Sequence, residues 1–276
     1  MIARDPRFGA PTVLQGESRS KRGGGNLLLL YGEGAGRGLL KVYRRRGSAR
    51  REVTKRIGFV LLERKRGVTA QERRELERRN LELWRSHGFD VPALLDRPIP
   101  EAFAAEPALW LEYCPGPTLW DVVCAGSAPL AERCEALARG AADLGRRQGL
   151  ALELGERDLV SKHGSLKHIL VHGPRQVSFD LEGGYAATMP LLDALTDELS
   201  GFVRSLQRGS APDELHALGD AFAGGYGARE QLREIATYGA THRSLYRAVR
   251  RWDDRRRRGA GAKASGLGWL LERAEG

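Results

Sequence analysis

The stretch KHGSLKHILVHGPRQVSFDLEGG, residues 162–184, decides the fold of this chain. Two short apolar runs, Ile169–Val171 and Val177–Phe179, flank a segment whose Gly-Pro pair is a turn signal, so the pattern predicts a β-hairpin. His168 lies just before the first strand and Asp180 lies just after the second. The hairpin would therefore bring an imidazole and a carboxylate to one edge, which is an arrangement suited to a metal–nucleotide site.

The order His-Gly-x-Leu, Lys-His-Ile-Leu-Val and then a strand ending in Asp-Leu-Glu resembles the catalytic and metal-binding loops of the lipopolysaccharide kinases. These Kdo/heptose kinases belong to the protein-kinase-like superfamily. In protein kinases the loops read His-Arg-Asp-x-x-x-x-Asn and Asp-Phe-Gly; the first Asp accepts the hydroxyl proton, and the Asn and the second Asp hold Mg²⁺. The lipopolysaccharide kinases, which this segment resembles, commonly have His at the position of this Asn. The resemblance therefore implies that His168 and Asp180 bind Mg²⁺.

The proton-accepting Asp can be aligned in two ways. If His163-Gly-Ser-Leu is the His-x-Asp-Leu motif, Ser165 stands at the position of the base. If the segment from Asp158 to His163 is the Asp-x-x-x-x-His motif, the spacing is intact, at the cost of extra residues before the strand at Ile169. We favour an active enzyme with Asp158 as the base, and a pseudokinase marked by Ser165 remains open. His163 belongs to the candidate catalytic residues in both alignments.

A lysine stands at the centre of the short apolar strand predicted over residues 39–43. Burying an unpaired ammonium is costly, so Lys41 lies either on the solvent face of an edge strand or beside an acidic partner. The resemblance implies the second alternative. Lys41 corresponds to the kinase lysine that contacts the α- and β-phosphates of ATP.

Such a lysine needs a carboxylate on a facing helix. Residues 69–88 form a strong helix pattern, because Thr69 and Glu72 make a capping box and Gly88 follows the last turn. Glu77 recurs at helical spacing with Leu81 and Trp84, which places it on the inward face. Glu77 is therefore the predicted partner of Lys41, although an exposed Glu in an Arg-rich helix is the alternative.

The segment from Pro107 to Trp120 reads as an apolar strand that ends at Glu112 and breaks at Pro-Gly-Pro after Cys114. In this order of elements it resembles the linker between kinase lobes. The resemblance implies that main-chain atoms of Glu112 and Cys114 bind the adenine of ATP.

Together these patterns predict an α+β class and a two-lobed protein-kinase-like fold. We expect a small β-rich N-lobe with one long helix over residues 1–113, and a larger helical C-lobe over residues 114–276. Helical patterns in the second part are predicted over residues 131–149, 192–206, 213–226 and 229–258.

The chain of 276 residues carries a formal net charge of +10, which favours anionic partners. A basic region makes peripheral contact with an anionic membrane surface a prediction; it comprises Arg44, Arg45, Arg46, Arg50, Arg51, Lys55, Arg56, Arg64, Lys65 and Arg66. No nucleic-acid-binding module is recognisable, so a basic nucleic-acid-binding protein is only the alternative from another class. The three cysteines form no Cys-x-x-Cys pair, which argues against a disulfide framework and a structural zinc site.

The N-terminus lacks the apolar stretch of a signal peptide, and no apolar run approaches the roughly 18 to 20 residues of a membrane span. We therefore expect a cytoplasmic protein, with possible contact at the inner face of the membrane. The resemblance implies that it uses ATP and Mg²⁺ to phosphorylate a hydroxyl of a lipopolysaccharide core sugar, Kdo or heptose.

Overall fold

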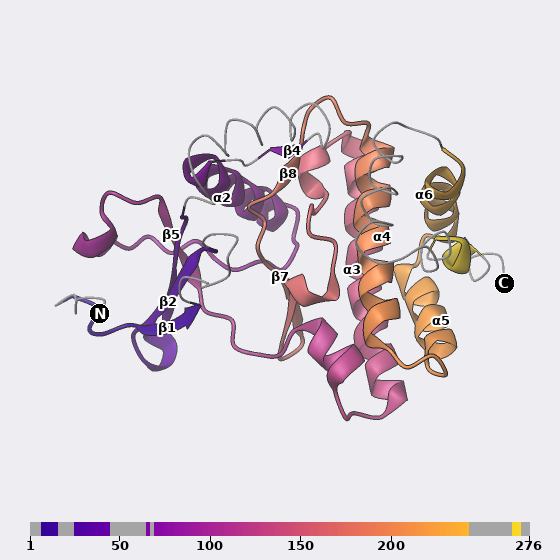
Figure 1. Cartoon of the computed structure of the whole chain (residues 1–276), viewed down its shortest axis with the longest axis horizontal. Helices are drawn as coiled ribbons and strands as arrows, with labels where there is room; N and C mark the ends of the chain where they lie inside the picture. The colour runs from indigo at the N-terminus through magenta and orange to yellow at the C-terminus, as the bar shows by residue number, and fades with distance from the viewer. Residues whose placement is uncertain (1–6, 16–24, 45–64, 67–68, 243–266, 272–276) are drawn as a thin grey trace.

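The computed structural model describes residues 7–15, 25–44, 65–66, 69–242 and 267–271. A β-rich part and a helical part lie side by side, as Figure 1 shows. This confirms the predicted two-lobed α+β class. Most of the basic region, residues 45–64, lies outside the described residues, and so does the arginine-rich end of the last predicted helix, at 243–258.

The β-rich part contains a four-stranded antiparallel sheet in the order β1-β2-β3-β5. Its strands are β1 (Thr12–Gln15), β2 (Leu27–Tyr31), β3 (Gly38–Val42) and β5 (Ala108–Glu112). Because β3 lies between β2 and β5, Lys41 belongs to an inner strand, and only 5% of the residue is exposed. The alternative with Lys41 on the solvent face of an edge strand is therefore wrong.

Side chains alternate between the two faces of this sheet. Leu29, Tyr31, Leu40 and Trp110 form a small apolar cluster on one face. Leu39, Leu109 and Leu111 instead join the main core of the molecule. Lys41 alternates with Leu40 and thus lies on the opposite side from the small cluster, toward helix α2.

Helix α2 (Ala70–Ser86) has the predicted limits. Thr69 and Glu72 form the capping box, with both hydrogen bonds at 3.1 Å, and Gly88 has the positive φ of 74° that ends such a helix. Above it in Figure 1, the short strand β4 (Lys65–Arg66) pairs with β8 (Gly184–Tyr185). A segment next to α2 is therefore tied to the region that follows Asp180.

The predicted hairpin is present as β6 (Ile169–His172) and β7 (Arg175–Ser178), and the chain turns at Gly173 with φ 59°. The segment after β5 lies directly against β6. A Cβ atom at Gly116 would come within 2.1 Å of the Val171 carbonyl oxygen, so only glycine permits this approach.

The second part is mainly helical, with α3 (Leu130–Leu154), α4 (Leu191–Gly209), α5 (Leu215–Tyr226) and α6 (Arg229–Thr241). Short helical turns are also present: η1 (Gly34–Gly36), η2 (Glu101–Phe103), the π-helical η3 (Asp121–Ala125), η4 (Arg157–Leu159) and η5 (Leu166–His168). Among the described residues, no helix is long and apolar enough to cross a bilayer.

Helix α3 is longer than its pattern predicted, because it passes Gly149 and ends at Gly155, which has φ 64°. The glycines inside α3 serve close packing. A Cβ atom at Gly145 would lie 2.3 Å from the Tyr226 carbonyl oxygen, and one at Gly149 would lie 2.9 Å from Oε1 of Gln231. Glycine here admits neighbouring helices and does not end the helix.

A buried ion pair joins α3 and α4. Arg147 Nη2 lies 2.7 Å from Glu198 Oε1, and both side chains are at most 6% exposed. Glu198 also accepts hydrogen bonds from the Ser161 backbone N–H at 2.8 Å and from Gln148 Nε2 at 2.9 Å. This carboxylate therefore fixes the segment that leads to His163.

Replacing Glu198 with Ala should lower the free energy of unfolding by about 3–5 kcal/mol, because it leaves the Arg147 guanidinium buried without its carboxylate. Urea unfolding followed by circular dichroism measures this loss. Glu135→Ala is the control, since its ion pair with Arg139 is exposed and should contribute at most about 1 kcal/mol. Equal losses in the two variants would contradict the role given to Glu198.

Candidate active site

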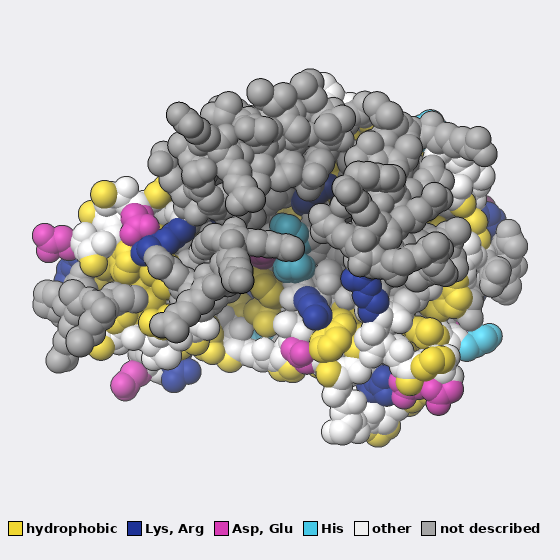
Figure 2. Space-filling view, in the orientation of Figure 1, with side chains coloured by type: hydrophobic (Ala, Val, Ile, Leu, Met, Phe, Trp, Pro, Cys, Tyr) yellow, Lys and Arg dark blue, Asp and Glu magenta, His cyan; other side chains and the backbone are white. Residues whose placement is uncertain are grey.

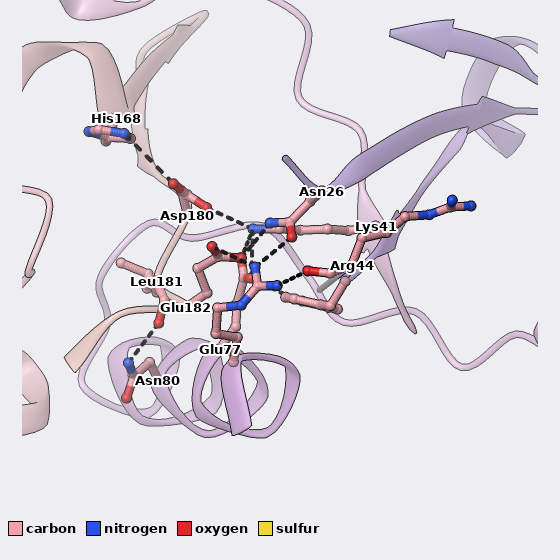
Figure 3. Close-up of polar contacts among 11 residues, drawn as sticks. Asn26, Lys41, Arg44, Glu77, Asn80, His168, Asp180, Leu181 and Glu182 are labelled. Carbon is pink, nitrogen blue, oxygen red and sulfur yellow. Dashed lines mark hydrogen bonds and ion pairs between the residues drawn. The ribbon is translucent and has the colours of Figure 1, made fainter. Parts of the chain in front are cut away.

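The ammonium of Lys41 is the centre of a buried charge cluster (Figure 3). Its Nζ atom lies 2.7 Å from Glu77 Oε2, 2.8 Å from Asp180 Oδ1 and 3.3 Å from Glu182 Oε2. The Tyr43 hydroxyl also donates to Glu77 Oε2, at 2.5 Å. Residues from the sheet, from α2 and from the segment after the hairpin thus converge on one point, and the structure brings Lys41, Glu77 and Asp180 together there.

Asp180 reaches this point through an unusual backbone conformation. Its φ is 62°, and no other described non-glycine residue has a positive φ. Such a conformation costs an ordinary residue on the order of 1 kcal/mol, although Asp and Asn tolerate it better than most. This strained residue lies where several charged side chains converge. Strained backbone conformations concentrate at functional sites in proteins.

A second layer of polar groups surrounds the Lys41 cluster. Arg73 Nη1 lies 3.1 Å from Glu182 Oε1 and 2.6 Å from Asn26 Oδ1. Asn26 Nδ2 in turn donates to Glu182 Oε2. All three residues are buried, with at most 7% of each exposed. Sequence reasoning did not assign any of them to the site.

The spacing of polar residues along α2 could have predicted part of this second layer from the sequence. Arg73, Glu77 and Asn80 follow one another at intervals of four and three, so they share one helical face. Asn80 Nδ2 donates to the Leu181 carbonyl at 2.8 Å, one residue before Glu182. Three polar residues on the inward face of a helix would have indicated buried polar partners. Asn26 shows no comparable pattern.

The electrostatics of the cluster follow from burial and pairing. Burial lowers the pKa of Lys41, but the carboxylates of Glu77, Asp180 and Glu182 together raise it more, so Lys41 is an ammonium. Burial raises the pKa of Asp180, but Lys41 and then His163 lower it well below its ordinary value of 3.8. The stability that ionised Asp180 contributes is therefore present above pH 3.8 and is lost only as the pH falls further.

Two histidines lie beside Asp180. His168 Nε2 is 3.7 Å from Asp180 Oδ2, and the rings of His163 and His168 have centroids 5.1 Å apart. Burial lowers the pKa of His168, which favours the neutral imidazole. Figure 2 shows histidine side chains at the surface near the centre of this face, with Lys or Arg side chains close by.

The two candidates for the base are in different places. Ser165 lies on the same loop as His163 and His168, and its hydroxyl is 3.1 Å from the hydroxyl of Ser205 on α4. Asp158 lies on η4, where its carbonyl accepts a hydrogen bond from Trp84 Nε1 at 2.9 Å. Among the described residues, Ser165 lines the small hollow beside His163 and His168, and Asp158 does not. Both assignments stay predictions.

The linker residues are held by the fold itself. The Glu112 N–H donates to the Ala93 carbonyl at 2.7 Å, so that main-chain donor is not available to an adenine. The Glu112 carboxylate accepts from the Ala93 N–H at 3.0 Å and from Arg175 Nη1 at 3.1 Å. Cys114 is buried. The predicted contact of Glu112 with adenine is thus limited to its backbone carbonyl. The predicted main-chain contact of Cys114 with adenine is unchanged.

The acidic residues of the cluster fit a hard divalent cation. Glu77, Asp180 and Glu182 each offer a carboxylate oxygen, and these oxygens lie within 4.8 Å of one another. Three carboxylates face two cations, Lys41 and Arg73, which leaves one excess negative charge. Oxygen ligands of this kind suit Mg²⁺, whereas the imidazole of His168 more often binds softer metals.

Comparisons with known proteins add little to this geometry. No protein-family model and no curated protein matches the chain. Among solved structures, a choline/ethanolamine kinase family protein from Mesorhizobium loti is similar over 97% of this chain and 87% of that chain, with 12% identity and a TM-score of 0.41. A structure described as a kinase domain is similar over 98% of this chain and 92% of that chain, with 8% identity and a TM-score of 0.41.

The chain's own geometry defines a protein-kinase-like fold. A lysine on an inner strand pairs with a glutamate on the facing helix, and an aspartate after a later hairpin contacts the same lysine. The lipopolysaccharide kinase family, in contrast, remains a sequence-based expectation.

Replacing Lys41 with Met should lower the free energy of unfolding by about 3–5 kcal/mol at pH 7.5, because three carboxylates would then share a buried site without their ammonium. The loss should be smaller at pH 5. Burial raises the pKa of Glu77 while Lys41 lowers it, so without the ammonium this carboxyl pKa rises further. The carboxyl group then binds a proton more readily at pH 5 than at pH 7.5, and the variant recovers part of its stability at the lower pH.

Urea unfolding at the two pH values, with wild type measured beside the variant, tests this prediction. The control is Arg78→Met, because Arg78 lies on the exposed side of α2 and pairs with Glu75 and Glu82. It should lose at most about 1 kcal/mol at either pH. A Lys41→Met loss that is small, or that grows toward pH 5, would show that the cluster is not held by the ammonium.

Proposed function

We propose that this protein binds Mg²⁺-ATP between its two parts and transfers the γ-phosphoryl group to a hydroxyl, with a lipopolysaccharide core sugar as the acceptor. The observation that supports the nucleotide site best is the contact of one buried ammonium with both Glu77 and Asp180. Phosphoryl transfer requires mainly positioning and charge neutralisation, and this cluster offers a cation for phosphates beside an acid for a metal ion.

Each residue then has a defined role. Lys41 would contact phosphate oxygens, and Glu77 would hold Lys41. Asp180 would bind Mg²⁺, with His168 beside it, and Mg²⁺ would neutralise charge on the phosphates. The adenine would lie near the Glu112 carbonyl and Cys114. Asp158 would accept the proton of the acceptor hydroxyl.

The acceptor is the finer part of the proposal and rests on the resemblance in residues 163–182. The net charge of +10 is in keeping with an acceptor carried on an anionic membrane surface.

A specific observation favours a second candidate function, a nucleotide-binding protein without phosphotransfer. The hydroxyl of Ser165 faces Ser205 on α4, and in one of the two alignments Ser165 stands at the position where a kinase has its base. If Asp158 does not reach the acceptor, Mg²⁺-ATP would bind without turnover. Such a protein would respond to nucleotide through its conformation.

Mg²⁺-ATP at a hundredfold excess over its dissociation constant should raise the melting temperature of the wild type by about 5–10 °C, since such binding adds about 2.7 kcal/mol. Asp180→Asn should remove the Mg²⁺-dependent part of the shift, because the amide tolerates the positive φ but lacks the charge. Thermal unfolding with ATP in Mg²⁺ or in EDTA measures both effects. Glu135→Gln, on an exposed helix face, should behave like wild type. A wild type without any shift would refute the nucleotide site.

Asp158→Asn should reduce kcat by about 10²-fold or more, as expected for the loss of a general base, while the affinity for Mg²⁺-ATP stays unchanged. Ser165→Ala should change kcat less than tenfold, because its hydroxyl contacts Ser205. Phosphate incorporation into purified core oligosaccharide is the assay. The opposite pattern would move the base to the Ser165 loop, and ATP binding without any transfer in wild type would support the second candidate function.

A further inference from the structure

Helix α2 is attached at two points to the segment that follows Asp180. Arg73 contacts Glu182, and Asn80 donates to the Leu181 carbonyl; Glu77 lies between them on the same helical face. Figure 3 shows Glu77 and Asn80 on the helix below Leu181 and Glu182. The position of Glu77 relative to Asp180 is therefore also fixed by contacts that involve neither of the two.

Arg73 and Asn26 also extend this attachment to the sheet. Asn26, next to β2, contacts both Arg73 and Glu182, and Arg73 Nη2 donates to the Arg44 carbonyl just beyond β3. Asn26, Arg73 and Glu182 are each less than one-tenth exposed, whereas Arg44 is more exposed. The guanidinium of Arg73 thus joins three separate elements, and the carboxylate of Glu182 that it fixes lies 3.3 Å from Lys41 Nζ.

We propose that Arg73, Asn26 and Glu182 form a positioning network that holds the Lys41 ammonium in place for the phosphates of the nucleotide. This inference rests on the proposed function. Glu182 is a third acidic contact of Lys41, and it is fixed on its other side by two residues. Because a fork-shaped guanidinium and an amide bind its two oxygens, Glu182 has little freedom to turn away. Lys41 is consequently held before nucleotide arrives, which preorganises the phosphate site.

The clearest test removes the network without changing the charge of the cluster. The double variant Arg73→Met with Glu182→Met takes away one cation and one anion, and apolar replacement of a buried ion pair is often neutral for stability. The double variant Arg78→Gln with Glu82→Gln is the matched control, since it removes an ion pair from the exposed face of the same helix.

Calorimetry then measures the dissociation constants for Mg²⁺-ATP and for adenosine in the three proteins. We expect the network variant to bind Mg²⁺-ATP at least tenfold more weakly than wild type while its adenosine affinity stays within twofold. In the proposed site Lys41 contacts only the phosphates, so loss of its position should weaken the binding of Mg²⁺-ATP and leave that of adenosine unchanged. A network with a merely structural role would weaken the binding of both ligands alike. The control variant should match wild type for both.

Equal changes for the two ligands, or no change for either, would overturn the positioning role while leaving the nucleotide site in place. A wild type that binds adenosine and ATP equally, or neither of them, would overturn the proposed function and the positioning role with it.

If the double variant does not fold, Asn26→Ser is the second variant, because it removes only an uncharged member. It should weaken Mg²⁺-ATP binding about threefold with adenosine unaffected, and an unchanged ratio of the two affinities would contradict the proposal.

Discussion

The interaction on which this structure depends is the contact of one buried ammonium with three carboxylates. Lys41 comes from an inner strand, Glu77 from a helix, and Asp180 and Glu182 from a segment more than a hundred residues later in the chain. None of these charges is stable alone in a buried position, so each element must take the place that supplies its partner. The cluster thereby ties the β-rich part to the hairpin region.

The residues around this cluster suggest how it can be both stable and chemically useful. Arg73, Asn26 and Asn80 donate hydrogen bonds to the segment that contains Leu181 and Glu182. Asp180, in the same segment, keeps a positive φ that brings its carboxylate toward Lys41. The cluster has one excess negative charge, so it can accept one further cation. A site that lacks one positive charge, beside a lysine held in place for phosphates, matches the needs of a metal-bound nucleotide.

Much of the fold could be predicted from the sequence, because local signals there are strong. The capping box at Thr69 and the turn at Gly173 each specify one local structure. Glu77 could be chosen by its helical face. Arg73 and Asn26 could not be found, since their role comes from contacts between distant elements. The sequence pattern predicts a helix end at Gly149, although close packing against Gln231 explains this glycine. The position of the base depends on loop geometry, which residue spacing does not determine.

The most direct test of the central claim is a crystal structure with Mg²⁺ and a non-hydrolysable ATP analogue. We expect a phosphate oxygen within hydrogen-bond distance of Lys41 Nζ, the metal ion on Asp180, and Glu77 still paired with Lys41. An analogue bound at another place, with Lys41 and Asp180 still in contact only with each other and their acidic neighbours, would contradict the account.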